Sequence, residues 1–181
     1  GDQLLLVLTT NRDATLTAPT GAGTWGAPVQ QGTGDKGEVE TTVYAKKADG
    51  TEAGQVLRIG FDATSKYTLT AAAYSGATLD SATLAAETTN RAAHTTPAAT
   101  VTTAGSWIAS YWADKTSATT DWTSPAGTTD RAETIGTASG RITSLLVDTN
   151  APVPTGTRPG LTATATSASL KATTLTLVLR P

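Results

Sequence analysis

Short runs in which every second residue is apolar constrain the fold of this chain more than any other feature of its sequence. In Leu175–Leu179, leucines alternate with threonine and valine, and Tyr67–Tyr74 shows the same period of two, which is the side-chain period of a β-strand. Two further apolar runs are Leu4–Leu8 and Trp107–Trp112. Threonine, which is abundant throughout, is β-branched and favours strands. No segment has the apolar stripe of a buried helix, so the chain is predicted to be all-β with little or no helix.

The order of strands and turns repeats once along the chain. Residues 1–76 and residues 105–181 each begin with an apolar run that leads to a polar tip, then to a Thr-x-Pro-x-Gly turn at Pro19 or Pro125, and then to further strands. A single sheet leaves one of its faces wet, so two such halves are predicted to form the two layers of one β-sandwich domain over residues 1–181. Exchange of strands between the layers would make this sandwich jelly-roll-like.

The repeat also predicts which positions of the two halves are equivalent. Leu6 and Ala109 are expected to face a common interior with Leu69 and Leu175, because a slip of one residue would turn every side chain to the opposite face. The two Thr-x-Pro-x-Gly turns are expected to match one another. Residues 77–104, which join the halves, are interpreted as a crossing strand with a loop.

Charge and composition argue against several classes of protein. The net charge is −2 and only 15% of residues are charged, so the clustered Lys and Arg of a nucleic-acid-binding surface are missing. No run of about 18 apolar residues occurs, and membrane insertion is therefore not expected. The chain has no Met, and both of its ends fall inside strand-like runs. We interpret it as a module cut from a longer protein.

Catalytic residues are not expected in this chain. His94 is the only imidazole, there is no Cys, and no Gly-x-Ser-x-Gly sequence is present. A hydrolase would require His94 to lie within hydrogen-bond reach of a serine and a carboxylate, whereas we expect it in a loop, where it caps a turn. Glu38 and Glu40 have the spacing of a glycosidase pair, but their polar neighbours predict a solvated edge rather than a shielded acid.

No metal or cofactor is predicted, although calcium binding stays open. A zinc site is not expected, because one histidine without cysteine leaves mainly carboxylates as ligands. Loop oxygens of residues 35–40, or those of Asp114, Asp121 and Asp130, are of the kind that bind calcium. Neither group has the spacing of an EF-hand loop.

Tryptophans are the most plausible binding residues, with two interpretations. Trp122 and Trp25 flank the two Thr-x-Pro-x-Gly turns. At the rim of a sandwich they would form a platform for a sugar ring, with Asp121 and Asn11 as hydrogen-bonding neighbours. Alternatively, each indole fills the end of a core that has only one Phe, and this interpretation is favoured.

The chain resembles a family of Thr/Ala-rich β-sandwich modules found in secreted multidomain proteins of actinobacteria and in tail or other virion proteins of their phages. The resemblance covers nearly the whole chain and is carried by the following segments: Gly1–Leu6, Ala72–Gly76, His94–Pro97, Ser106–Lys115 and Thr123–Gly127. It implies an accessory, non-catalytic role and transfers no binding residues. The low Phe content departs from the pattern expected of the family.

These observations lead to two functional hypotheses. The first is a structural or adhesive module of a phage virion or of a secreted or cell-surface protein, located in the virion or outside the cell. Its partners would be protein neighbours in the assembly, and Thr-rich strand edges would also allow self-association. The alternative is a carbohydrate-binding module that uses the rim tryptophans on a cell-surface glycan.

Overall fold

The computed structural model describes residues 1–181, and its regular secondary structure consists almost entirely of antiparallel β-strands. The only helical element is a 3-10 turn, η1 (Asp35–Gly37). The strands are β1 (Gln3–Thr10), β2 (Gln30–Gly34), β3 (Val39–Lys47), β4 (Tyr67–Tyr74), β5 (Thr78–Ala86), β6 (Arg91–Thr95), β7 (Ala99–Val101), β8 (Trp107–Lys115), β9 (Trp122–Thr123), β10 (Thr129–Ile135), β11 (Ile142–Asp148), β12 (Gly156–Arg158), β13 (Thr162–Ser169) and β14 (Ala172–Arg180). The predicted all-β sandwich class is confirmed, and the four apolar runs found in the sequence all lie in strands.

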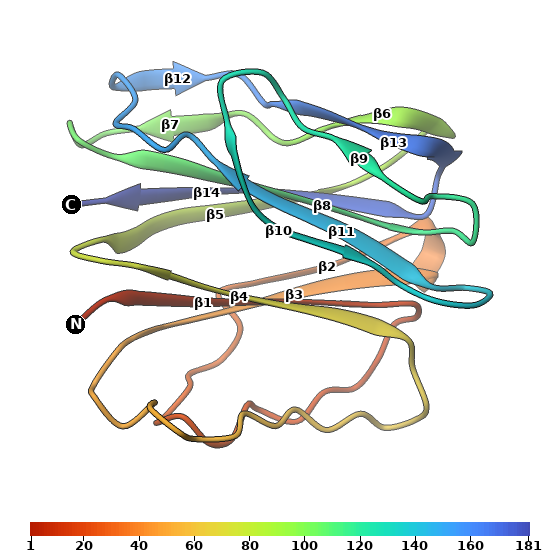
Figure 1. The fold of residues 1–181 in the computed structure, drawn as a ribbon, viewed down its shortest axis with the longest axis horizontal. Coiled ribbons are helices and arrows are strands. Elements are labelled where there is room, and N and C mark those ends of the chain that lie inside the picture. The colour runs from red at the N-terminus through yellow and green to blue at the C-terminus, as the bar shows by residue number, and fades with distance from the viewer.

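Two large sheets face one another, and a further layer of short strands covers one of them (Figure 1). The four-stranded sheet has the order β2-β3-β1-β4, and the five-stranded sheet has the order β10-β11-β8-β14-β5. The outer layer consists of β6-β13-β9 and β12-β7, which lie on the far face of the five-stranded sheet. On the far face of the four-stranded sheet, the segments 11–29 and 48–66 take the place of strands.

The main core lies between the two large sheets. Leu5 and Val7 of β1 meet Tyr111 of the central strand β8 and Leu175 and Leu177 of β14 in one buried cluster. The alternation of apolar residues seen in the sequence therefore places one side of each strand in this core. Leucine and valine fill most of this cluster, Tyr111 is its only aromatic member, and threonines occupy other buried positions of the same strands.

Buried hydroxyl groups complete the contact between the sheets. The Tyr111 hydroxyl on β8 forms hydrogen bonds with Thr9 of β1 at 2.9 Å and Thr68 of β4 at 3.3 Å. The chain of hydroxyls continues from Thr9 to Thr41 at 2.7 Å, and from Thr41 to Thr173 of β14 at 2.6 Å. All five side chains belong to buried residues, so these groups satisfy one another away from water.

The outer layer is attached through two small apolar clusters and through hydrogen bonds to its backbone carbonyl oxygens. Thr174 and Thr176, on the face of β14 that points away from the core, donate to the carbonyls of Thr95 and Pro97. Trp112 Nε1 donates to the His94 carbonyl at 2.9 Å. The polar positions that alternate with leucines in β14 thus hold the third layer in place.

The two halves of the chain have the same strand order. In the first half β2, β3, β1 and β4 are neighbours in that order, and β10, β11, β8 and β14 follow the same order in the second half. Descent of the halves from a duplicated ancestor stays a prediction. The second half also supplies β9, β12 and β13 to the outer layer. Neither half contributes strands to both large sheets, so the two large sheets are connected more simply than in a jelly roll, in which strands are exchanged between sheets.

The expected residue equivalence is wrong. Leu6 packs with Trp25 and Tyr44 on the far face of the four-stranded sheet, whereas Ala109 lies in the core between the sheets. Leu69 is 39% exposed. The apolar run of β1 is buried on both faces, so the sequence pattern does not show which of its residues point inward.

The turns and the joining segment also differ from expectation. Pro125 lies in the tight turn between β9 and β10, but Pro19 belongs to the irregular segment before β2, where Thr20 bridges to Arg58. The two turns are therefore unlike. Residues 77–104 form three strands, β5, β6 and β7, rather than one crossing strand with a loop, because β5 pairs along nearly its whole length with β14.

Replacement of Thr41 by Val should remove the middle of the hydroxyl chain. We expect Thr41→Val to lower the free energy of unfolding by about 1–3 kcal/mol, because the hydroxyls of Thr9 and Thr173 lose a buried partner. Thr42→Val is the matched control, since Thr42 is equally buried but its hydroxyl has no partner. Urea unfolding measures both, and an equal loss in the two variants would contradict the role assigned to the hydroxyl chain.

Candidate functional site

The two tryptophans proposed as a sugar platform are buried. Trp122 packs with Trp112 between the five-stranded sheet and the outer layer, and its Nε1 donates to Thr143 Oγ1 at 3.2 Å. Trp25 lies on the far face of the four-stranded sheet, and Lys46 Nζ is 5.7 Å from its ring. Neither indole presents a face to solvent, because each fills a small core between layers. The interpretation as core fillers is the one that fits.

The proposed neighbours of these tryptophans do not form a site with them. Asp121 is exposed, and its backbone carbonyl accepts a hydrogen bond from Thr166 N. Asn11 connects the halves of the chain, because Nδ2 donates to the Gly140 carbonyl while Oδ1 accepts from Lys66 N. The four residues are therefore divided between different parts of the fold.

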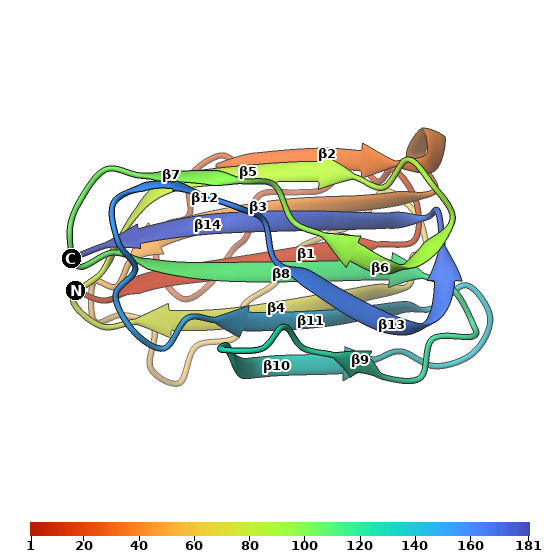
Figure 2. The same ribbon diagram turned by 90° about the horizontal axis from the view of Figure 1, so that it is seen from above.

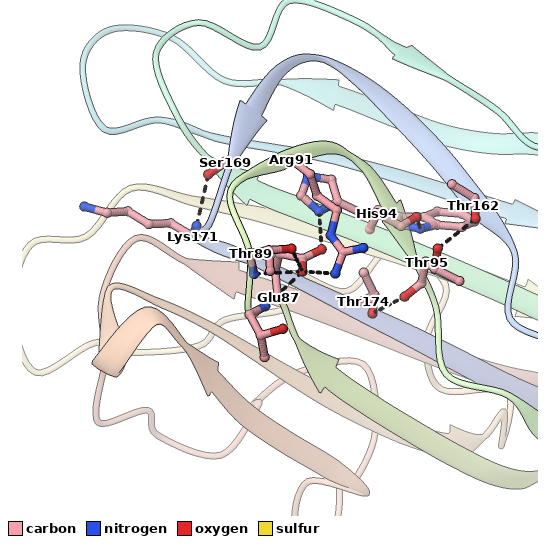
Figure 3. Close-up of polar contacts among 11 residues, drawn as sticks. Glu87, Thr89, Arg91, His94, Thr95, Thr162, Ser169, Lys171 and Thr174 are labelled. Atoms are coloured by element: carbon pink, nitrogen blue, oxygen red, sulfur yellow. Dashed lines mark hydrogen bonds and ion pairs between the residues drawn. The ribbon is translucent and has the colours of Figure 1, made fainter.

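A cluster of charged and polar side chains surrounds His94 instead (Figure 3). His94 lies in strand β6 rather than in a loop, and its side chain is fully buried. Its Nδ1 is 2.9 Å from Glu87 Oε2, and its ring lies 5.8 Å from that of Trp122. Glu87 directly follows β5, so the pair joins the five-stranded sheet to the outer layer.

The second oxygen of Glu87 collects several further hydrogen bonds. Oε1 accepts from Arg91 Nη2 at 2.8 Å, from Thr88 N at 2.9 Å, and from both N and Oγ1 of Thr89. Burial by itself would raise the pKa of Glu87, but the hydrogen bonds from His94, Arg91 and the backbone outweigh it and lower the pKa to about 2. The carboxylate is thus held in its charged form by its own surroundings.

The His94 cluster lacks the arrangement of a hydrolase. His94 Nε2 is buried and has no hydrogen-bond partner, so no serine stands where a nucleophile would be activated. The side chain has no exposed surface through which a substrate would reach it. The condition set for a hydrolase, a serine together with a carboxylate beside His94, is met only for the carboxylate.

A second buried carboxylate lies nearby on β8. Asp114 accepts hydrogen bonds from Thr119 Oγ1 and Thr143 Oγ1, each at 2.6 Å. Burial raises the pKa of Asp114, and the two hydroxyl donors counteract only part of this effect. Since Thr143 also accepts from Trp122 Nε1, the polar groups form one continuous chain beneath the outer layer.

The carboxylates considered for calcium or for acid–base chemistry are separated or already occupied. Glu40 is buried and accepts from Ala14 N and Gln31 Nε2, whereas Glu38 is exposed and pairs with Lys115 and Lys171. The expectation that both glutamates lie on a solvated edge is therefore wrong for Glu40. No group of three or more His, Asp or Glu side chains is placed to hold a metal ion.

A cavity of about 530 Å³ lies at the end of the sandwich where the two chain termini are found (Figure 1). The lining residues that carry polar or large side chains are Tyr74, Trp107, Arg131, Asp148, Leu179 and Arg180. Asp148 is fully buried and binds Arg131 through both oxygens, at 2.6 and 2.9 Å. Burial, together with Asp148, raises the pKa of Tyr74, so its hydroxyl stays protonated. Trp107 is only partly buried.

The residues of this cavity and of the His94 cluster could not be grouped from the sequence. Glu87 and His94 are seven residues apart and face one another only because β5 and β6 belong to different layers. Arg131 and Asp148 meet across the β10–β11 pair, at a bulge between Asp130 and Ala132. No turn residue or break in the sequence pattern marks the position of this bulge. An isolated Glu or Asp within a Thr-rich strand was the only available hint, since such residues are seldom buried without a partner.

Comparison with protein-family models, with curated proteins and with solved structures finds no match. The chain also contains no helix with the length and apolar character needed to cross a membrane. Function is therefore argued from the residues themselves.

Glu87→Gln should destabilise the fold in a manner that depends on pH. At pH 7 we expect the free energy of unfolding to fall by about 1–3 kcal/mol, because His94 and Arg91 lose their charged partner. The pKa of Glu87 is lower in the folded chain than its ordinary value of 4.5, so its stabilisation is complete above that pH and is lost as pH falls toward 2. The difference between variant and wild type should therefore shrink over this interval.

Chemical denaturation at several pH values measures this effect, and Glu38→Gln provides the control. The pKa of Glu38 is also lowered to about 2, by hydrogen bonds from Lys115 and Lys171, but the side chain is exposed and its ion pairs are screened by water. We expect only a small loss in this variant. A larger loss for Glu38→Gln than for Glu87→Gln would contradict the analysis.

Proposed function

We propose that this chain is a non-catalytic structural or adhesive module of a phage virion or of a secreted or cell-surface protein. The observation that carries the proposal is the use of its buried charged groups. Glu87, Asp114 and Asp148 are each enclosed and occupied by hydrogen-bond donors from the chain itself. Glu87 joins two layers, and Asp114 and Asp148 bind side chains of their own sheet or of an adjoining loop. Carboxylates that are saturated in this way have little capacity left to bind or activate a substrate.

The layered architecture gives further support. Three layers of strands are connected by buried hydroxyls, by donors to backbone carbonyls and by the Glu87–His94 pair. This construction needs no disulfide, and the chain contains no cysteine. A layered body of this kind suits a protein that holds its neighbours in place or bears force within an assembly. Its partners would be protein neighbours, and its location would be the virion or the exterior of the cell.

The carbohydrate-binding alternative receives no support from the residues first chosen for it. A sugar platform requires an aromatic face in contact with solvent, and Trp25 and Trp122 are 8% and 5% exposed. The structural or adhesive hypothesis is therefore the one we carry forward.

Localisation of the chain in its native source tests the proposal. An antibody raised against residues 1–181 should label purified particles or surface filaments in immunogold electron microscopy, because a structural module stays with its assembly. Antibody absorbed beforehand with the purified chain is the control and should give no label. Recovery of the chain only as a free cytosolic monomer would contradict the proposed function.

A further inference from the structure

Strand β4 is an edge strand without the features that normally prevent edge pairing. It is the last strand of the four-stranded sheet and pairs with β1 over eight residues without a register shift. It contains no charged residue and no proline. Tyr67 and Leu69, on its outward face, are 55% and 39% exposed, and Ala71 and Ala73 continue this face. A long, regular and uncharged edge of this kind is a template for another strand.

The other edges of the large sheets are protected. β2 has only five residues and lies against β5, where Gly32 leaves no room for a side chain beside Leu84. β5 has an irregular register near its start and is covered by β2. β10 carries a bulge between Asp130 and Ala132 and also contains Arg131 and Glu133. Among these edges, only β4 is at once long, regular in register and uncharged.

The sandwich also lacks a strand opposite β10. Seen from above, β2, β3, β1 and β4 lie beneath β5, β14, β8 and β11, and β10 extends beyond β4 (Figure 2). Contacts between β2 and β5, β3 and β14, and β4 and β11 agree with this arrangement. The residues of β10 are mostly exposed, as expected of a strand without a partner beneath it. One strand added to β4 would occupy this position.

The cavity at the end of the sandwich belongs to the same vacant position. Its lining includes the edge residues Ala71–Tyr74 of β4 together with Arg131 of β10. At the opposite end, the β10–β11 turn reaches down to Lys66, whose Nζ donates to the carbonyl of Ser139 at 2.6 Å. The cavity therefore lies at the Tyr74 end of β4, whereas the Tyr67 end lies beside the β10–β11 turn.

The charge of the cavity indicates what would enter it. Two arginines and one aspartate line it, although the chain as a whole has a net charge of −2. Arg131 is neutralised by Asp148, whereas Arg180 has only a long contact to Asp80, 3.5 Å from Nε to Oδ1, and its terminal amino groups form no hydrogen bond. A carboxylate is the complementary group for the terminal amino groups of Arg180, which the ion pair with Asp80 leaves without a hydrogen bond.

We propose that β4 accepts an extended peptide segment of a partner protein as a fifth strand beneath β10, with an acidic residue of that segment at Arg180. Only a polypeptide offers a row of N–H and C=O groups to match the free edge, and small or apolar residues at alternate positions would fill the cavity. A folded second copy does not fit, because β10 extends beyond β4 by one strand and the position beneath it therefore takes a single strand. The inference rests on the proposed function, since it describes how the module joins its neighbours.

A synthetic peptide tests the proposal directly. The probe is an acetylated and amidated octapeptide with an aspartate at its first position, followed by alternating threonine and valine, and it is titrated into the full chain labelled with ¹⁵N. We expect chemical-shift changes in β4, in β10 and around the cavity, and exchange of the free-edge amides of β4 slowed about tenfold or more at saturation. The same peptide with proline at alternate positions should not bind, because it lacks the necessary N–H groups.

Arginine variants test the charge complementarity. Arg180→Gln should weaken binding of the acidic peptide about tenfold, the effect of losing one charge-assisted hydrogen bond. Arg158→Gln is the matched control, because Arg158 lies on β12 in the outer layer and should leave binding unchanged. Thermal unfolding of both variants verifies that the fold is intact. Equal weakening by the two substitutions would overturn the assignment of the acidic residue to Arg180.

Other outcomes would overturn strand addition as a whole. These are unchanged exchange of the β4 amides at millimolar peptide, dimerisation of the chain through β4 without peptide, and cavity shifts caused by methyl glucoside but not by the peptide. The localisation experiment is independent of these results. Peptide binding by a chain found free in the cytosol would refute the proposed function alone, and an assembly component that ignores the peptide would refute strand addition alone.

Discussion

Hydrogen bonding among buried hydroxyls is the interaction on which the rest of this fold depends. A polar group costs free energy in a core unless it is paired, and the core between the two large sheets contains many threonines. Tyr111, Thr9, Thr41 and Thr173 meet this requirement by bonding to one another across the two sheets. Such pairing tolerates no slip in strand register, because a shift of one residue would turn the hydroxyls away from their partners. A chain with few large apolar residues thereby obtains a specific, closely packed interior.

The same principle extends to the charged groups and to the outer layer. Thr174 and Thr176 use the alternate face of β14 to donate to backbone carbonyls of the layer above. Glu87 and His94 add a buried pair between these layers. Breaking one partner of such a pair is costly, so the residues that would be candidates for chemistry in another protein here serve to hold layers together. This use of polar groups is why a structural role fits the chain better than a catalytic one.

The unequal size of the two sheets is the basis of the proposed strand addition. Four strands face five, and the vacant position beneath β10 lies next to β4, the one edge that is both long and uncharged, and next to the cavity beside Arg180. A sandwich completed by a strand from outside gains backbone hydrogen bonds and core packing in one step. An open edge is a liability in a free monomer, but it is an asset in a protein that has to join its neighbours.

The sequence by itself determined the class of fold, because apolar residues recur with a period of two in Leu175–Leu179 and Tyr67–Tyr74. This period is that of a strand and not that of a helix. It also indicated two similar halves, and these halves have the same strand order in the structure. Only the tertiary structure decided which face of β1 points inward and that His94 meets Glu87. It also decided between the two interpretations of Trp25 and Trp122, which fill cores, as the favoured interpretation held, and do not form a sugar platform. The reason is physical: period fixes the direction of side chains relative to their own strand, whereas burial and pairing depend on which layer packs against each face.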